Sequence, residues 1–337
     1  RHPLLHRASL DTMICLDQPH HMPLRREHMP FFTPGYIAKL RQRVDEKVTS
    51  LLDEMERRGP VVDMVELFSA ELPLFTLCEM LGVEPADRPK LVKWMHYLEL
   101  AGHAMRGGEH ISEDFLNDFL QNVQDMFDYG QAALRARREA PRNDLLTAIA
   151  NAKIDGEPLS DEFLDGSWLL IVFAGNDTTR NSLSGTMRLL TEFPGEKAKL
   201  LEAPDRITNM VHEAIRMVSP VIYMRRTATC EAQIAEQRIG EGEKVVMYYG
   251  AANRDPSMFP DPDRFDVERP NAKDHIAFGI GPHVCLGQRV ANMQLEAAYR
   301  QILARFPNIR WTGEQSIAPN NFVHAISSLE VDLGTGG

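Results

Sequence analysis

Apolar residues recur every three or four positions along most of the chain, with charged residues between them, and this period predicts α-helices. The segment 160–192 is the most informative of these helices. Ser160 can cap its first turn, Asp161 suits the positive end of the helix dipole, and Pro194 follows its end. A helix of that length crosses a whole domain. Helices are predicted over residues 34–58, 63–81, 87–100, 112–139, 160–192, 205–218 and 286–306.

The strand signal is weak and lies after Pro220, where β-branched and aromatic residues are concentrated. Strands are predicted over residues 221–229, 233–239 and 244–249. Residues 251–280 are rich in Asn, Asp, Pro, Arg and Phe without any period, which predicts a long ordered loop. No flexible linker, low-complexity tract or repeat divides the chain. We therefore expect a mainly α fold with small β-sheets, in a single domain that spans residues 1–337.

Composition and charge narrow the class of protein. The 337 residues are 43% hydrophobic and 25% charged, which is typical of a globular protein, and the net charge of -11 argues against a nucleic-acid partner. The longest apolar stretch, residues 168–174, is too short to span a membrane, and no signal peptide opens the sequence. We expect a soluble, cytoplasmic protein. The four cysteines lack the paired spacing of a disulfide framework or zinc site.

One cysteine lies in an unusual loop, Phe278-Gly-Ile-Gly-Pro-His-Val-Cys-Leu-Gly287, which leads directly into a predicted helix. Its glycines let the backbone turn sharply and approach a flat ligand, and a helix N-terminus stabilises a thiolate. A lone cysteine beside glycines is ordinarily only a buried turn residue. The full spacing instead favours a metal-binding sulfur at Cys285.

A second unusual segment, Ala174-Gly-Asn-Asp-Thr-Thr179, interrupts the apolar pattern of the long helix with polar residues. Alone it is typical of a helix cap or exposed turn. Within a helix, Ala174 and Gly175 leave space for a flat macrocycle and O2. A Thr178 hydroxyl bonded back to the Ala174 carbonyl would open the helix to water. The pattern indicates a proton path.

These residues carry a resemblance to a known family. Phe278, Gly281, His283, Cys285 and Gly287 match the heme-binding signature of the cytochrome P450 family residue for residue. Further motifs follow in family order from Asp17 to the C-terminus, so the chain is similar to a soluble bacterial member. The resemblance implies the cytochrome P450 fold, heme b as cofactor and Cys285 as the iron ligand. The implied cofactor-binding residues around it are Ala174, Gly175, Phe278, Gly279, His283, Cys285 and Gly287.

The helix motif resembles the family's Ala/Gly-Gly-x-Asp/Glu-Thr-Thr/Ser pattern, in which Asp177 and Thr178 take the places of an acid–alcohol pair that delivers protons during oxygen activation. A peroxide-driven peroxygenase of the same fold typically lacks this pair. Its presence therefore favours O2 and electrons from a reductase. A heme-thiolate sensor or carrier without turnover stays as a further alternative, and so does a helical scaffold without heme.

Charged motifs resemble family elements that support the heme. Glu213 and Arg216 match Glu-x-x-Arg, which joins an arginine from a later loop, here Arg269, in a structural role. On its own such a pair is an ordinary surface contact. His21 and Arg25 lie in a segment similar to Asp-Pro-Pro-x-His-x-x-x-Arg, with Gln18 in place of the first proline. They are candidate partners of the heme propionates. Arg226 is a third candidate, and the choice between it and its neighbour Arg225 stays open.

The resemblance also implies partners. We expect a [2Fe–2S] ferredoxin with its ferredoxin reductase as electron donor, docking near Cys285, where Arg25, Arg26, Lys273 and Arg289 could attract an acidic protein. A typical member carries a further N-terminal stretch with the first helices and most of the larger sheet. We therefore expect this sequence to be N-terminally incomplete, with part of the substrate-access wall missing.

The substrate is expected to be a small apolar molecule. By position in the family, the pocket residues are apolar and offer no cation for a carboxylate. The segments 175–182 and 224–228 resemble bacterial branches that hydroxylate alkanes, fatty acyl chains, terpenoids and sterol side chains. The similarity of these segments could instead reflect common ancestry and not a shared substrate. An apolar aliphatic, terpenoid or steroid-like substrate is therefore an expectation. The predicted pocket residues are Leu170, Ile171, Val221, Ile222, Met224 and Phe322.

Overall fold

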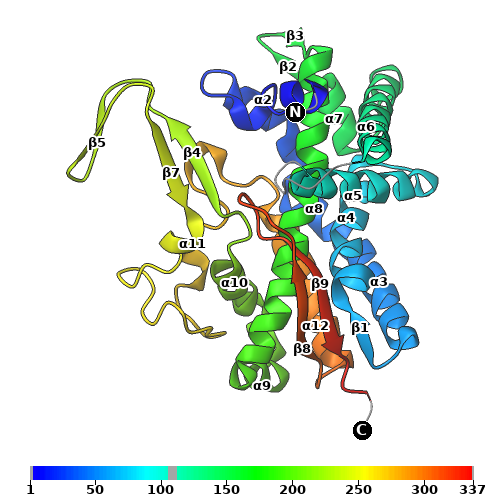
Figure 1. Cartoon of the computed structure of the whole chain (residues 1–337), viewed down its shortest axis with the longest axis vertical. Coiled ribbons are helices and arrows are strands. Elements are labelled where there is room, and N and C mark those ends of the chain that lie inside the picture. Colours follow the sequence, from blue (N-terminus) through cyan, green and yellow to red (C-terminus); the bar gives the residue numbers. More distant parts are fainter. Residues whose placement is uncertain (1–2, 105–111, 336–337) are drawn as a thin grey trace.

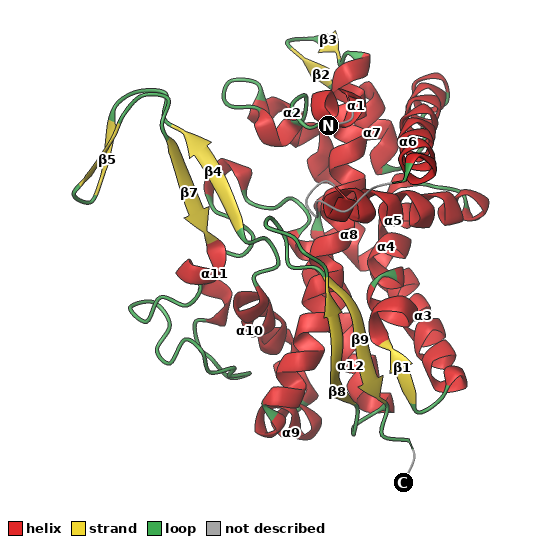
Figure 2. Ribbon diagram, in the orientation of Figure 1, coloured by secondary structure: helices red, strands yellow, loops and turns green. Residues whose placement is uncertain are grey.

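Helices make up most of the computed structural model, which describes residues 3–104 and 112–335 (Figure 2). The 32-residue helix α8 (Asp161–Glu192) runs through the middle of the molecule, with other helices around it (Figure 1). As predicted, Ser160 caps α8 by accepting the backbone N–H of Phe163. The mainly α fold class is confirmed. The other helices are α1 (Pro3–Ala8), α2 (His21–His28), α3 (Pro34–Arg58), α4 (Glu71–Leu81), α5 (Arg88–Ala104), α6 (Glu113–Glu139), α7 (Leu145–Asn151), α9 (Pro194–Glu202), α10 (Ile207–Val218), α11 (Tyr249–Ala252) and α12 (Gln288–Arg305).

Large buried side chains tie α8 to its neighbours. Trp168 is fully buried and donates its indole N–H to the carbonyl of Met126 on α6, at 3.1 Å. From α12, the hydroxyl of Tyr299 donates to the carbonyl of Leu183 at 2.5 Å. Each ring buries a large apolar area and satisfies its polar atom, so these contacts stabilise α8 and also fix its position. The position of α8 matters because it carries the polar segment at Ala174–Thr179.

The sheets are small: β8 and β9 run along the lower half of the helical body, whereas β4, β7 and the hairpins β2–β3 and β5–β6 lie outside it (Figure 1). One antiparallel sheet has the order β1–β9–β8, and it pairs Val62 of β1 with Val331 of β9. A second, β4–β7, begins with Tyr223 opposite Tyr248 and stands apart from the helices. Hairpins β2–β3 and β5–β6 complete the strands. Their bounds are β1 (Val61–Asp63), β2 (Lys153–Ile154), β3 (Glu157–Pro158), β4 (Tyr223–Thr227), β5 (Ala232–Ile234), β6 (Gln237–Ile239), β7 (Lys244–Tyr248), β8 (Arg310–Ile317) and β9 (Ile326–Asp332).

Several predicted elements were wrong in detail. Residues 233–239 form the hairpin β5–β6, not one strand, because Ala235 adopts a left-handed φ of 51° and reverses the chain. Residues 63–81 begin with the end of β1 and a π-helical turn, Val65–Ser69, before α4 starts. Asp63 causes this change, since its carboxylate accepts the backbone N–H of Val65 at 2.8 Å. The predicted helix 286–306 begins at Gln288.

Strands β8 and β9 and the short helices α1, α2, α7, α9 and α11 were not predicted. The strands pair with each other and with β1, so their stability depends on contacts distant in sequence. Residues 253–280 are mostly irregular, as expected for the long loop. Across residues 3–104 and 112–335, no helix combines the length and apolar character needed to cross a bilayer.

Candidate functional site

The cysteine loop folds back on itself immediately before α12. Cys285 donates its backbone N–H to the carbonyl of Phe278 at 2.8 Å, and Val284 donates to the carbonyl of Gly281 at 3.0 Å. Gly279 and Gly281 adopt φ values of 73° and 76°, which side chains rarely tolerate. The glycine spacing therefore allows the turn that presents the Cys285 side chain.

The Cys285 thiol lies deep in the protein and is still accessible to solvent. Burial raises its pKa, although hydrogen bonds from the backbone N–H groups of Gly287 and Gln288 and the charge of Arg25 lower it. The side chain nevertheless has exposed surface. Cys285 is therefore available to a ligand. The expected stabilisation of a thiolate by the helix N-terminus is present, but burial outweighs it, so a metal cation would be needed to hold the sulfur ionised.

Side chains from α2 gather beside this loop. The rings of His21 and His283 stack with centroids 3.9 Å apart, and Arg25 donates to the carbonyl of Val284 at 2.6 Å. Burial lowers the pKa of His21, and the neighbouring His283 and Arg25 lower it further, while Asp17 raises it. Nδ1 of His21 is buried and has no hydrogen-bond partner among the described residues. The positive charge of Arg25 beside these two rings suits an anionic ligand.

Arg226 on β4 completes the cationic cluster. Burial first, and then the charge of Arg226, lower the pKa of His283. The same charge lowers the pKa of Tyr249, although burial outweighs it there. In the β4–β7 ladder Arg226 is opposite Val245, and Arg225 is opposite Val246. Successive strand residues point to opposite faces, so Arg226 faces the loop and Arg225 faces away.

The polar segment of α8 forms the bonds that its sequence suggested. The Thr178 hydroxyl donates to the carbonyl of Ala174 at 3.0 Å, and the Ser182 hydroxyl donates to the carbonyl of Thr178 at 2.8 Å. Ala174 is exposed although it lies at the middle of a central helix, and a Cβ on Gly175 would meet only Leu77, at 3.6 Å. Ala174 and Gly175 therefore leave this side of α8 without bulky side chains.

Asp177 is buried, with a side-chain oxygen 3.6 Å from Nη2 of Arg180. Asn181 is fully buried, donates to the carbonyl of Asp177 at 2.8 Å, and accepts the backbone N–H of Ile326 at the start of β9, also at 2.8 Å. The sequence analysis did not single out Arg180 or Asn181. The signal in the sequence was their spacing from Asp177, because residues three and four positions apart are neighbours on a helix.

A buried ion network lies behind the cysteine loop. Arg216 and Arg269 both bind the Glu213 carboxylate, with Nε–O distances of 2.7 and 2.9 Å, and all three side chains are buried. Arg216 also donates to the carbonyl of Asn253 at 2.7 Å. The Asn253 amide oxygen in turn accepts the backbone N–H of Ile276 at 2.8 Å. The network thus pins the irregular chain that leads to Cys285.

The predicted pocket residues are all partly exposed. They lie on α8 and in two further segments, which are hydrogen-bonded to each other. Val221 pairs with Val323, and Ile222 donates its N–H to the carbonyl of Phe322 at 2.8 Å. Ile171 differs from the others because it packs partly against the hydrophobic core. The intermediate exposure is shared by Leu170, Ile171, Val221, Ile222, Met224 and Phe322.

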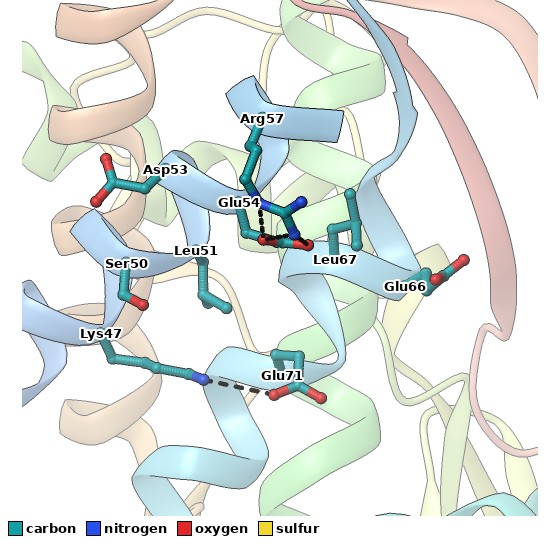
Figure 3. Close-up of a pocket in the computed structure, with 9 residues that line it drawn as sticks. All are labelled: Lys47, Ser50, Leu51, Asp53, Glu54, Arg57, Glu66, Leu67 and Glu71. Carbon is teal, nitrogen blue, oxygen red and sulfur yellow. Dashed lines mark hydrogen bonds and ion pairs between the residues drawn. The ribbon is translucent and has the colours of Figure 1, made fainter. Parts of the chain in front are cut away.

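A surface hollow between α3 and α4 is a separate feature (Figure 3). Two of its acidic side chains are paired with basic ones, since Lys47 pairs with Glu71 at 3.5 Å and Arg57 pairs with Glu54. It contains none of the residues described above. We therefore assign the functional site to the region of Cys285 and α8.

Comparison with known proteins shows which family this chain is similar to. A family model described as cytochrome P450 matches residues 6–323. Linalool 8-monooxygenase of Pseudomonas putida is 34% identical over 321 residues, which are 95% of this chain and 77% of that protein. A methyl-branched lipid omega-hydroxylase of Mycobacterium bovis is 32% identical over 324 residues, covering 95% of this chain and 74% of that protein. The structure of a Mycobacterium marinum cytochrome P450 in complex with pseudoionone has a TM-score of 0.87 and 34% identity, covering 97% of this chain and 78% of that one.

Proposed function

Because this chain belongs to the cytochrome P450 family, a family of heme-thiolate monooxygenases, we propose that it hydroxylates an unactivated carbon of an apolar aliphatic, terpenoid or steroid-like substrate. The family binds heme b through a cysteine thiolate, and we assign that role to Cys285. Heme supplies the activation of O2 when electrons reach it from a separate redox partner.

The observation that carries this assignment is the gathering of one deep, accessible thiol with a cluster of cationic and imidazole groups. His21 and Arg25 come from α2, His283 from the cysteine loop and Arg226 from β4, and the arginine charges help to lower the pKa of the two imidazoles. The guanidinium groups of Arg25 and Arg226, beside the two imidazole rings, suit the propionates of heme. The bare surface of Ala174 and the absent side chain of Gly175 leave room for the macrocycle.

Absorption of the reduced carbon monoxide complex tests the ligand. The wild-type protein and Cys230→Ser, a change at an exposed free cysteine, should both give the spectrum of thiolate ligation. Cys285→Ser should abolish it. A histidine-type spectrum in well-folded wild-type protein would overturn the heme-thiolate assignment.

Asp177 and Thr178 are proposed to deliver protons during oxygen activation. The Thr178 hydroxyl donates a hydrogen bond to the Ala174 carbonyl at 3.0 Å. Its oxygen can still accept a hydrogen bond from a proton donor, and the hydroxyl can then pass its own proton on. The buried Asp177 lies one residue before it and is the proposed proton source. This pair favours the O2-dependent monooxygenase over a peroxygenase or a sensor.

Replacing Thr178 with Ala should leave heme and substrate binding intact and lower the product formed per NAD(P)H several-fold, with peroxide formed instead. Thr178→Ser is the control, because it keeps the hydroxyl. For Asp177→Asn we expect slower turnover of folded protein. Unchanged coupling in Thr178→Ala would remove the hydroxyl from the mechanism.

A branched aliphatic substrate is supported by the wall residues and by the relatives. Leu170, Val221, Ile222, Met224 and Phe322 are apolar and partly exposed, so the wall can select by shape but cannot grip a charge. Linalool, methyl-branched lipids and pseudoionone, in the names of the compared proteins, are all branched and mainly hydrocarbon. A panel of alkanes, fatty acids, monoterpenes and steroids, read by the spin shift of the heme and by product, tests this. Binding of only small polar aromatics would refute it.

For the redox partner we propose a [2Fe–2S] ferredoxin with its reductase. Arg26, Lys273 and Arg289 are exposed, whereas Arg25 is committed to the Val284 carbonyl and is the weakest candidate for docking. Arg289→Glu should slow electron transfer and weaken its salt dependence. Arg238→Glu, on the distant β5–β6 hairpin, is the control. Equal rates in both variants would exclude this docking face.

A further inference from the structure

Two imidazole rings lie behind the cysteine loop and have no part in the function proposed so far. His212 is on α10, directly before Glu213, and His275 is in the irregular segment that leads to Phe278. Their ring centroids are 6.0 Å apart, inclined at 42°. His275 is only 9% exposed. An imidazole as deep as that of His275 needs a specific reason, because burial of a titratable group is costly.

The hydrogen bond of His275 fixes its tautomer. Nδ1 of His275 accepts the backbone N–H of Ala277 at 3.2 Å, so the ring proton of the neutral form is on Nε2. Ala277 is itself buried, and its N–H would otherwise be left without a partner at a free-energy cost. His275 therefore acts like a turn residue whose side chain accepts the backbone N–H two residues ahead.

The His275 ring also connects to Cys285 through one residue. It packs against Phe278 with a centroid distance of 5.5 Å, and the Phe278 carbonyl accepts the backbone N–H of Cys285 at 2.8 Å. The same stretch is held by the bond from Gly279 N–H to the carbonyl of Ile276, at 2.8 Å. A displacement of His275 would therefore be transmitted to the backbone that presents the thiol.

The surroundings keep His275 neutral. Burial, followed by the nearby His212 and Arg216, lowers its pKa to about 4. Around His212, burial and Lys273 lower the pKa while Glu296 raises it. At neutral pH His275 therefore acts on the loop through its ring and its accepting nitrogen, and not through a positive charge.

We propose that His275 is a positioning residue for the cysteine loop, fixing Ala277 through Nδ1 and Phe278 through its ring, and so keeping the Cys285 sulfur in its thiolate bond to heme. This inference rests on the proposed function, in which Cys285 is the iron ligand. A correctly held loop keeps the N–H groups of Gly287 and Gln288 on the sulfur, where they withdraw electron density from it.

Two substitutions separate the contributions of ring and acceptor. His275→Phe keeps a ring beside Phe278 but removes the acceptor of the Ala277 N–H. His275→Asn loses the ring but keeps an acceptor, because an Asn side chain readily accepts the N–H two residues ahead. His212→Phe is the matched control, since it alters the neighbouring imidazole and leaves the bond to Ala277 in place.

The holoproteins are compared by the rate at which the reduced carbon monoxide complex loses its thiolate spectrum in mild urea, and by the heme midpoint potential. His275→Phe should lose the thiolate form several-fold faster than wild type and shift to a more negative potential, as the sulfur loses hydrogen bonds. His212→Phe should stay within about twofold of wild type, and His275→Asn, which keeps the acceptor but loses the ring, should lie between wild type and His275→Phe.

Equal behaviour of His275→Phe and wild type, or equal loss in His275→Phe and His212→Phe, would overturn the proposal. If His275→Phe yields no holoprotein, His275→Asn decides: the proposal requires it to form the thiolate complex and to lose it faster than His212→Phe does, and equal rates in these two variants would overturn the proposal. Absence of a thiolate spectrum in the wild type would instead contradict the proposed function and not the inference about His275.

Discussion

The two sides of the site are built on opposite principles. The chain before Cys285 is irregular, yet buried charged and polar side chains hold its backbone, with Arg216 on the Asn253 carbonyl and Asn253 on the Ile276 N–H. The segment around Thr178 is a regular helix in which hydroxyl and amide groups bond to carbonyls one turn back. The irregular side depends on side chains for its shape, while the regular side already has its shape from the backbone.

This difference predicts where substitutions change stability and where they change chemistry. In the network at Glu213 each polar group is buried, so loss of one partner leaves a charge unpaired. In α8 the carbonyls that accept the Thr178 and Ser182 hydroxyls already belong to helical turns, so loss of either hydroxyl leaves little unsatisfied. The free energy of unfolding should therefore be sensitive on the first side and tolerant on the second.

The largest effect is expected for Glu213→Gln. The change leaves Arg216 and Arg269 buried without their carboxylate, which should lower the free energy of unfolding by about 3 to 5 kcal/mol. Urea denaturation measures it. The control is Glu54→Gln, at a carboxylate paired with exposed arginines on α3, and it should have almost no effect. Similar losses in both variants would contradict the contrast between buried network and surface pair.

A smaller effect comes from acid. The pKa of His275 is lowered to about 4 from the ordinary 6.5, so between these values the unfolded chain binds a proton that the folded protein excludes. This contribution to stability is therefore complete above pH 6.5 and is lost as the pH falls toward 4, by about 3 kcal/mol in all. Urea denaturation at several pH values should show a shallower acid loss for His275→Asn than for wild type. Parallel curves would mean that His275 is not kept neutral by the fold.

The local features of both sides were predictable from the sequence, and their long-range contacts were not. The cap at Ser160 and the bond from Thr178 to Ala174 involve residues three or four apart, which periodicity reveals. The pairing of Glu213 with Arg269 followed only from the family resemblance. The second bond of Asn181 goes to Ile326, in a strand that the sequence analysis missed because its partners are β1 and β8. The catalytic roles of Asp177 and Thr178 stay predictions.

Asn181 is the exception on the helical side, because its amide oxygen also serves a residue outside the helix. Asn181→Leu leaves the buried N–H of Ile326 without an acceptor and should cost about 1 to 3 kcal/mol of unfolding free energy. Asn151→Leu is a matched control. Asn151 donates to the carbonyl four residues back at 2.9 Å, as Asn181 does, but it is exposed. If urea denaturation gives equal losses, the bond to Ile326 contributes nothing and the helical side is uniformly tolerant.

The smallest effect on stability is expected for Thr178→Ala, the variant with the largest expected effect on coupling. The hydroxyl bonds to a carbonyl that lies within a helical turn, so its removal strands no buried group. Ala also has a higher helix propensity than Thr, and the free energy of unfolding should stay the same or rise by about 0.5 kcal/mol. Urea denaturation of the holoprotein and product formed per NAD(P)H should be measured on one preparation. A stability loss comparable to that of Asn181→Leu would mean that Thr178 supports the fold, and the fall in coupling would then have a structural cause instead of a missing proton donor.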